Sequence, residues 1–346
     1  MTEFPELVVH IGAGKTGSTS IQFMLKRNEK PLLEQKTAYF GLTLEHIPQA
    51  RVFSWCEDKA PQSFFRAPDK QKVEAEAVQV VLAELERLGK LGIRQAIWSN
   101  EAFLTRSDRV LGIFKALKDA GVRMRFICYV RRHDKWARSG YVQFGIKFKT
   151  YKGPVRTFSE WAAHQDIGFS DDIAKWTDAF PGAIELYNFD VVSDVAQHFL
   201  SLIGLSGIST VHANSSPSDA LLAMWAVHNS CYEETVLPHR FSQIARETGI
   251  LHPSPATATP PIDELLPTVD DLRSIQDSYK DDFDQVNELL VSRGEPPLVF
   301  DELAPSEPDA APWSIEKLLT LMICSQQEQI WQLKQEIADL KASRED

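Results

Sequence analysis

A lysine, three hydroxyl side chains and three glycines stand together near the start of the chain, in Gly12-Ala13-Gly14-Lys15-Thr16-Gly17-Ser18-Thr19. Glycines let a backbone close around an anion without Cβ clashes, and the lysine and hydroxyl groups add hydrogen-bond donors. An apolar run at 7–11 precedes this segment and helix-forming residues follow it, and a helix N-terminus also attracts anions. The pattern predicts a strand, an anion-binding loop and the start of a helix.

The P-loop of nucleoside-triphosphate enzymes, G-x-x-x-x-G-K-[ST], is one kind of site with this outline. Gly14, Lys15 and Thr16 match its end, but the glycine that should open it falls on Val9. The motif also expects an aspartate after a later strand to hold magnesium. The two best later strands run instead into Glu101 and into a pair of arginines. The spacing therefore disfavours a P-loop.

The dinucleotide-binding fingerprint G-x-G-x-x-G is a second kind of site, and Gly12, Gly14 and Gly17 match its spacing. The fingerprint also needs an acidic residue about 20 positions further on, at the end of the second strand. Glu34 stands at a suitable distance, but its neighbours at 31–36 are typical of a helix. The fingerprint therefore lacks its partner.

The third kind of site is the phosphosulfate-binding loop of sulfotransferases that use 3′-phosphoadenosine 5′-phosphosulfate (PAPS). The segment 10–20 resembles that loop, which is often written with the core P/H-K-[ST]-G-[ST]-[ST]. Residues 15–19 match this core, whereas Gly14 stands where the family has proline or histidine.

A second segment carries the same resemblance. In PAPS sulfotransferases, an arginine at the end of a strand is followed eight residues later by a serine on the next helix. Here the strand expected at 123–130 leads into Arg131, and Ser139 stands eight positions on, in a helix expected at 133–146. The planar guanidinium fork suits a phosphate, and the resemblance assigns the 3′-phosphate of PAPS to this pair. The chain thus resembles PAPS-dependent sulfotransferases of the bacterial type over roughly residues 5–235.

The resemblance implies an α/β fold, with a parallel sheet flanked by helices as in P-loop-like sulfotransferases and with a helical C-terminal extension. It implies PAPS as co-substrate, a hydroxyl acceptor on a small molecule or glycan, and no metal. Lys15 would stabilise the charge that grows on the leaving phosphate. The other contacts implied for the phosphosulfate are Gly14, Thr16, Gly17, Ser18 and Thr19.

A hydroxyl acceptor also needs a general base within hydrogen-bond reach. Glu101 is our candidate, because it follows the strand expected at 94–99, at the sheet edge where ligands bind in open α/β folds. The alternative is that Glu101 caps the next helix, expected at about 107–120. His46 and His10 are further candidates, although a lone histidine within a strand, as His10 is, is typical of a packed core.

Two other functions stay open from the sequence: a P-loop kinase that transfers phosphate from ATP, and a nucleotide-binding scaffold without catalysis. A net charge of −11 argues against a general nucleic-acid-binding protein. The N-terminus shows no signal-peptide pattern, and no apolar run is long enough to span a membrane. The four cysteines form no metal or redox motif. These features predict a cytoplasmic enzyme.

Strand and helix patterns alternate along the first part of the chain, as a parallel sheet requires. We expect a sulfotransferase domain at 1–293, with a nucleotide-binding core at about 5–205 and a helical part at 205–293, and then a proline-rich linker at 294–312. Further expected elements are an irregular stretch at 37–68, a long helix at 69–89, short helices near 157–166 and 170–180, a strand at 182–190 and a helix at 191–203.

The segment 313–342 differs from the rest of the chain. An a/d heptad seam can be assigned to Ile323, Gln326, Ile330, Leu333, Ile337 and Leu340. We expect an amphipathic, coiled-coil-like helix that joins a second copy of the chain into a homo-oligomer. The alternative is that this helix packs back onto its own domain, since an isolated helix of this length needs a partner surface.

Overall fold

The computed structural model describes residues 4–56, 62–210, 219–230, 232–237, 241 and 265–300, together with Ile330, Leu333 and Ile337. The chain divides into two compact units. The sheet unit consists of Met1–Trp136, Ile167–Asn214 and Ser278–Phe300. The helical unit consists of Ala137–Asp166, Ser215–Asp277 and Asp301–Asp346. The domain limits expected at 293 and 312 stay predictions.

Only three positions of the expected coiled-coil-like helix at 313–342 fall within the described residues. Ile330, Leu333 and Ile337 are helical and exposed. The rest of that helix and the linker beyond residue 300 lie outside the described residues. Self-association through the heptad seam stays a prediction.

Five parallel strands form the sheet, in the order β2-β3-β1-β4-β5. They are β1 (Glu6–His10), β2 (Thr37–Tyr39), β3 (Gln95–Ser99), β4 (Met124–Val130) and β5 (Ile184–Asn188). β1 is central, and its Val9 pairs with Trp98 on one side and with Phe126 on the other. The apolar run of β1 fits this place, because parallel strands are covered on both faces. An α/β fold with a parallel sheet flanked by helices is confirmed.

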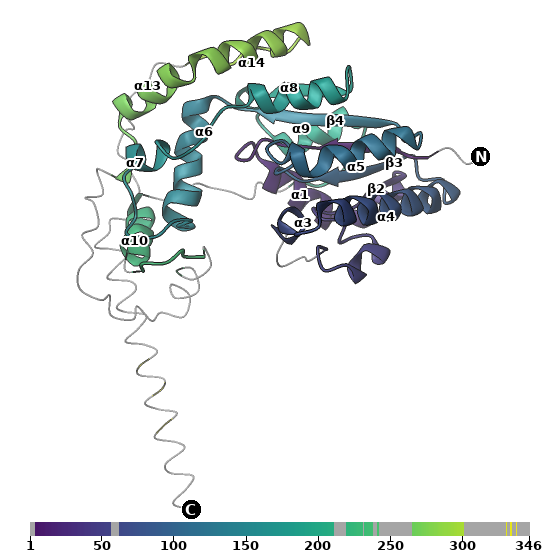
Figure 1. Cartoon of the computed structure of the whole chain (residues 1–346), viewed down its shortest axis with the longest axis horizontal. Helices are drawn as coiled ribbons and strands as arrows, with labels where there is room; N and C mark the ends of the chain where they lie inside the picture. Colours follow the sequence, from purple (N-terminus) through teal and green to yellow (C-terminus); the bar gives the residue numbers. More distant parts are fainter. Residues whose placement is uncertain are drawn as a thin grey trace, which may run out of the picture. The chain divides into compact units, whose positions relative to one another are not determined.

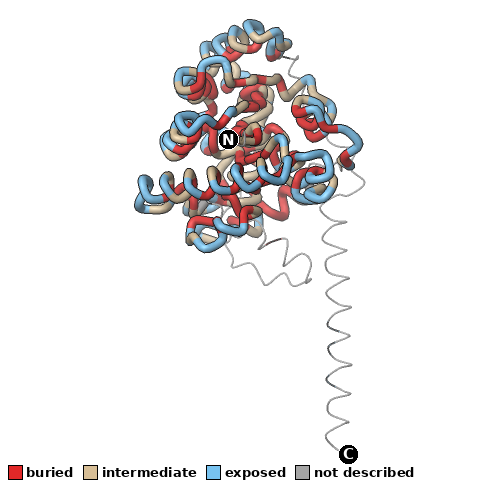
Figure 2. The backbone as a smooth tube through the Cα atoms, turned by 90° about the vertical axis from the view of Figure 1, so that its right-hand side faces the viewer, coloured by how far each residue is buried: buried red, intermediate tan, exposed pale blue. Residues whose placement is uncertain are grey.

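Helices cover both faces of the sheet (Figure 1). One face is covered by α1 (Ser18–Arg27), α2 (Glu29–Glu34) and α9 (Val195–Leu202). The other is covered by α3 (Gln62–Arg66), α4 (Lys70–Lys90), α5 (Ser107–Asp119), α8 (Ser170–Ala179) and α14 (Lys280–Ser292). Two short 3₁₀ helices, η1 (Pro48–Val52) and η3 (Phe189–Val191), follow β2 and β5. Exposed and buried residues alternate along the outer helices in Figure 2, as amphipathic helices require.

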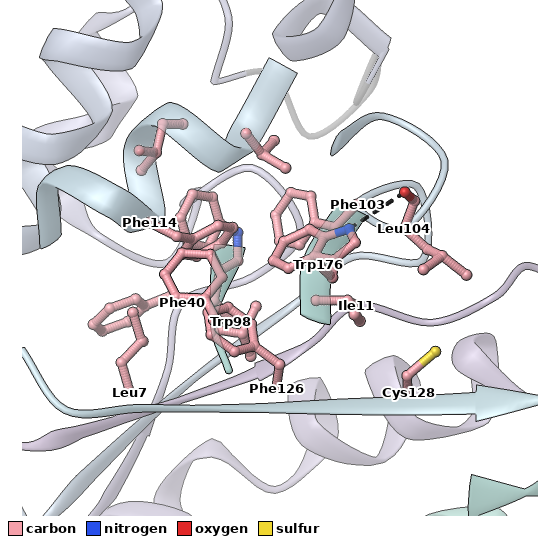
Figure 3. Packing of buried hydrophobic residues seen from close by; sticks show 14 of the residues in the cluster. Leu7, Ile11, Phe40, Trp98, Phe103, Leu104, Phe114, Phe126, Cys128 and Trp176 are labelled. Atoms are coloured by element: carbon pink, nitrogen blue, oxygen red, sulfur yellow. Dashed lines mark hydrogen bonds between the residues drawn. The ribbon is translucent and has the colours of Figure 1, made fainter. Parts of the chain in front are cut away.

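The core under α5 and α8 is aromatic (Figure 3). Trp98, Phe114, Phe126 and Trp176 are fully buried, and neighbouring ring centroids lie 5.2–5.6 Å apart. The indole N–H of Trp176 is satisfied by the carbonyl oxygen of Leu104 at 3.4 Å. Because such interlocked rings leave little room for movement, they hold β3 and β4 firmly beside β1.

The helical unit begins within α6 (His133–Gly140), which continues as a π-helix, η2 (Tyr141–Lys147). Among its described residues, this unit also contains α7 (Phe158–Ala162), α10 (Asp219–Ser230) and α13 (Val269–Ser278). Lys149 is fully buried in this unit, and its ammonium group donates to the carbonyl oxygens of Gly153 and Tyr232. Burial lowers the pKa of Lys149.

Most expected elements are confirmed, with shifted ends. The irregular stretch expected at 37–68 was wrong in part, because it holds β2, η1 and α3. β2 has only three residues, too few for an alternating pattern to appear. The helix expected at 191–203 begins only at Val195, where the carboxylate of Asp194 accepts from the backbone N–H groups of Ala196 and Gln197.

Candidate functional site

The loop from Ile11 to Gly17 joins the end of β1 to the start of α1. Three of its residues have left-handed backbone conformations: Gly12 (φ 66°), Lys15 (φ 68°) and Gly17 (φ 81°). A lysine in that region costs about 1–2 kcal/mol. The loop therefore holds Lys15 in a conformation that the rest of the structure must enforce.

Two of the three loop glycines are required by their neighbours. A Cβ on Gly12 would lie 2.6 Å from the Cα of Glu101, and one on Gly17 would lie 2.5 Å from the Cγ1 of Val195. Around Gly14 a Cβ would meet nothing within 4 Å. The loop thus packs tightly against the turn after β3 and against α9. Gly14, the position at which the chain departs from the sulfotransferase core, is open.

Carbonyl groups of the loop are tied to the protein. Trp136 Nε1 donates to Gly14 O at 2.7 Å, Thr16 Oγ1 donates to Ala13 O at 2.5 Å, and Cys128 Sγ lies 3.1 Å from Gly12 O. These carbonyl oxygens are therefore satisfied within the protein, whereas successive backbone N–H groups of such a loop can bind an anion.

The N–H groups of the loop and of the helix start remain available. Within the part of the chain that the structure describes, no acceptor is bonded to the backbone N–H of Gly14, Thr16, Gly17, Ser18 or Thr19. The hydroxyl of Ser18, 4 % exposed, also has no partner among those residues. Buried polar groups are almost always hydrogen-bonded, so this set of donors is suited to an anion.

Arg131 follows β4 and reaches this loop. Its Nη1 donates to Lys15 O at 3.2 Å, its Nε lies 3.5 Å from Asp190 Oδ1, and its guanidinium lies over the ring of Phe189, 5.2 Å from the centroid. Among the described residues, the buried Nε has no hydrogen-bond acceptor, and Nη2 has none either. Lys135 Nζ lies 3.8 Å from the same Asp190 oxygen. Two cations therefore meet one carboxylate beside the loop.

Burial lowers the pKa of Arg131, and the charge of Asp190 opposes that shift. An arginine's pKa is so far above neutrality that the group stays charged. A partly desolvated cation attracts an anion more strongly than an exposed one does.

The strand order explains why these two segments meet. The chain leaves β1 toward β2 and β3 on one side, and it leaves β4 toward β5 on the other. The carboxyl ends of β1 and β4 therefore flank a topological switch point, which is where open α/β sheets bind ligands. The Lys15 loop follows β1, and Arg131 follows β4.

Glu101 lies on the other side of the loop, directly after β3. Gln22 Nε2 of α1 donates to its Oε2 at 2.6 Å, and Oε1 has no partner among the described residues. Glu101 does not cap the next helix, because α5 starts at Ser107 with Arg106 at the N-cap. Asn100, not Glu101, caps the turn, by accepting from the backbone N–H of Ala102 at 3.0 Å.

The two histidine candidates are engaged elsewhere. His10 is fully buried in β1, its Nδ1 lies 2.8 Å from Ser99 Oγ, and burial lowers its pKa to about 3. It is the packed core histidine that the strand pattern favoured. His46 Nδ1 lies 2.9 Å from Glu29 Oε1 on the surface of α2.

Other sequence-predicted residues lie as follows. Val9 lies inside β1, and Glu34 lies in α2 rather than at a strand end, as expected from its neighbours. Thr19 is exposed on the first turn of α1. Ser139 lies on α6, in the portion that belongs to the helical unit, so its pairing with Arg131 stays a prediction.

The sequence analysis missed Gln22 and Asp190, whereas Lys135 is one of the basic residues near Arg131 that the sequence offers to a nucleotide site. Asp190 is part of the strand exit Asn188-Phe189-Asp190, but nothing in the sequence joins that exit to the arginine strand.

A scan against models of known protein families finds no match to this chain, and a search of curated proteins finds no similar sequence. No helix in the described ranges has the length and apolar character needed to cross a membrane. Nor do the described residues group three His, Cys, Asp or Glu side chains as a metal site would. The functional assignment therefore depends on the loop and its neighbours.

Proposed function

We propose that this chain is a sulfotransferase that moves the sulfuryl group of PAPS onto a hydroxyl of a carbohydrate or other small molecule. One observation supports this most. Five backbone N–H groups of the loop and helix start have no acceptor among the described residues, and they and the strained Lys15 lie beside a second cation, Arg131, at the switch point of the sheet. PAPS carries two anionic groups on one adenosine, and the loop and Arg131 offer one binding group for each.

Gly14, Thr16, Gly17, Ser18 and Thr19 would bind the phosphosulfate through their backbone N–H groups, with the Ser18 hydroxyl as a further donor. The hydroxyl of Thr16 serves the loop itself through Ala13 O. Arg131, through Nη2, would bind the 3′-phosphate. This division of roles follows the family resemblance.

The transfer is an in-line displacement at sulfur. The acceptor oxygen forms the new S–O bond while the bond between sulfur and the bridging phosphate oxygen breaks. The acceptor proton passes to Glu101, and the electron pair of the broken bond stays on the phosphate, where Lys15 neutralises it. Positioning and charge neutralisation supply most of the rate in such a reaction.

The direct experiment incubates the full-length protein with ³⁵S-labelled PAPS and a panel of glycans and phenols. The proposal predicts a labelled product with the wild type. Lys15→Ala and Glu101→Gln should each lower its rate by at least about a hundredfold, a typical loss for a transition-state charge contact or a general base.

The matched controls are Lys118→Ala in α5 and Glu86→Gln in α4, which change exposed residues outside the candidate site. Both variants should transfer at the wild-type rate. Phosphate transfer from ATP in the same assay would favour a kinase instead. Nucleotide binding without any transfer would favour a scaffold.

A further inference from the structure

We propose that Gln22 is a positioning residue that holds Glu101 as the general base and links it to the nucleotide-binding helix. The inference rests on the proposed function. It concerns a contact that no motif predicts, since 79 positions separate the two residues.

The contact is short and comes from the helix that starts the anion site. Gln22 Nε2 donates to Glu101 Oε2 at 2.6 Å. Gln22 lies four residues after Ser18, so the two side chains are on the same face of α1, one turn apart. α1 therefore fixes the position of the Glu101 carboxylate relative to any anion that the N–H groups at the start of this helix bind.

The backbone of Glu101 is fixed as firmly as its side chain. Asn100 N–H donates to His10 O at 3.0 Å and Leu104 N–H donates to Ile11 O at 3.1 Å, so the turn after β3 is bonded to both residues that lead into the loop. Gly12 leaves no room between the loop and the Cα of Glu101. Only the side-chain torsions of Glu101 can vary, and Gln22 restrains them.

The hydrogen bond from the Gln22 amide also gives the two carboxylate oxygens of Glu101 different roles. Oε2 accepts from Gln22, and Oε1 has no partner among the described residues. A neutral amide donor can orient a carboxylate without supplying a proton that would quench it. Oε1 is thus the oxygen that takes the acceptor proton, and Gln22 acts through Oε2.

Two variants of the full-length protein test this role. Gln22→Met keeps the length of the side chain but removes the donor, and kcat should fall on the order of 10- to 100-fold, as for other lost orienting contacts. The KM for PAPS should stay within about twofold, because the loop is untouched. Gln22→Glu keeps the shape but replaces the donor with a second carboxylate, whose negative charge repels that of Glu101. Its kcat at neutral pH should be lower than that of Gln22→Met.

A merely structural role predicts the opposite ranking, since Gln22→Glu preserves size. The matched control is Gln35→Met, which removes a 2.9 Å amide contact to Ser206 O at the amino end of β2, the opposite edge of the sheet. Gln35→Met should transfer at the wild-type rate. Two outcomes with an active wild type would overturn this inference alone: an unchanged kcat in Gln22→Met, or a higher kcat in Gln22→Glu than in Gln22→Met. A wild type that transfers no sulfuryl group overturns the proposed function and this inference with it.

Discussion

The guanidinium of Arg131 donates a hydrogen bond from Nη1 to the carbonyl oxygen of Lys15, at 3.2 Å. These residues are 116 positions apart and follow different strands, yet they are the two cations that the sequence singled out. The contact couples them mechanically, because the same arginine that is expected to hold the 3′-phosphate also fixes the backbone of the strained lysine.

Arg131→Lys should weaken the binding of 3′-phosphoadenosine 5′-phosphate by at least about tenfold. A lysine cannot reach Lys15 O and Asp190 while also presenting a donor to a phosphate, and one hydrogen bond to a charged group is worth about 1.5–3 kcal/mol. Calorimetric titration measures the affinity. The affinity for adenosine 5′-phosphate, which lacks the 3′-phosphate, should fall much less in the same variant.

The matched control for this variant is Arg125→Lys, at the start of the same strand, where the guanidinium pairs with Glu185 at 2.6 Å. That change should leave the affinity of both nucleotides unaltered. If Arg131→Lys lowered the affinity of both nucleotides equally, Arg131 would not be the residue that binds the 3′-phosphate.

Substitution of the loop glycines should separate them into two classes. Gly14→Ala should keep the free energy of unfolding within about 1 kcal/mol of wild type, because its surroundings are open. Gly12→Ala and Gly17→Ala should each cost more than about 1–2 kcal/mol, since each adds a left-handed alanine and a steric overlap. Chemical denaturation measures all three. A Gly14→Ala variant as unstable as the others would contradict the loop geometry.

The backbone strain at Lys15 can be measured apart from its charge. Lys15→Gly should be more stable than Lys15→Ala by about 1 kcal/mol, because glycine adopts a φ of 68° without cost. Both variants lose the ammonium group, so both should lose sulfuryl transfer. Denaturation curves measure the difference in stability, and the transfer assay measures the loss of activity. Equal stabilities would show that the left-handed conformation carries no strain.

How far the sequence leads differs between the loop and its surroundings. The strand, the glycine turn and the helix start at Ser18 follow from local residue types, and the arginine at the end of β4 follows from a short apolar run. Local patterns also placed Glu34 in a helix and so removed a dinucleotide site. β2 could not be predicted, because three residues show no periodicity.

The contacts that complete the site depend on the sheet order, which no local pattern states. Asp190 meets Arg131 only because β5 lies next to β4, and Gln22 meets Glu101 only because β3 lies next to β1, the strand that leads into α1. The requirement for Gly12 has the same origin, since its neighbour Glu101 is 89 positions away. Such juxtapositions are set by tertiary packing.

Protein stability should fall in mild acid because of His10. In the unfolded chain the His10 imidazole takes up a proton near pH 6.5, whereas burial lowers the pKa of His10 in the folded protein to about 3. The unfolded state therefore binds more protons between these values, and stability declines as the pH falls through that window by up to about 1.4 kcal/mol per pH unit. His10→Asn should flatten the decline when urea unfolding is followed from pH 7 to 4.5.

His198, whose pKa burial also lowers, is unchanged in that variant and contributes equally to both curves. Hydrogen bonds from His133 and Ser170 lower the pKa of Asp282 from 3.8 to about 2, so most of its contribution is lost below the measured range of pH 7 to 4.5. Parallel curves for the wild type and His10→Asn would show that the ring takes up its proton in the folded protein.

Calorimetric titration of the wild-type chain with 3′-phosphoadenosine 5′-phosphate, ATP and NAD tests the central claim most directly. Two anion-binding groups, one at the Lys15 loop and one at Arg131, predict that the first nucleotide binds without magnesium and at least about tenfold more tightly than the other two. They also predict that Lys15→Ala and Arg131→Lys each weaken that binding. Tighter binding of ATP in the presence of magnesium, or of NAD, would contradict the assignment of this site to PAPS.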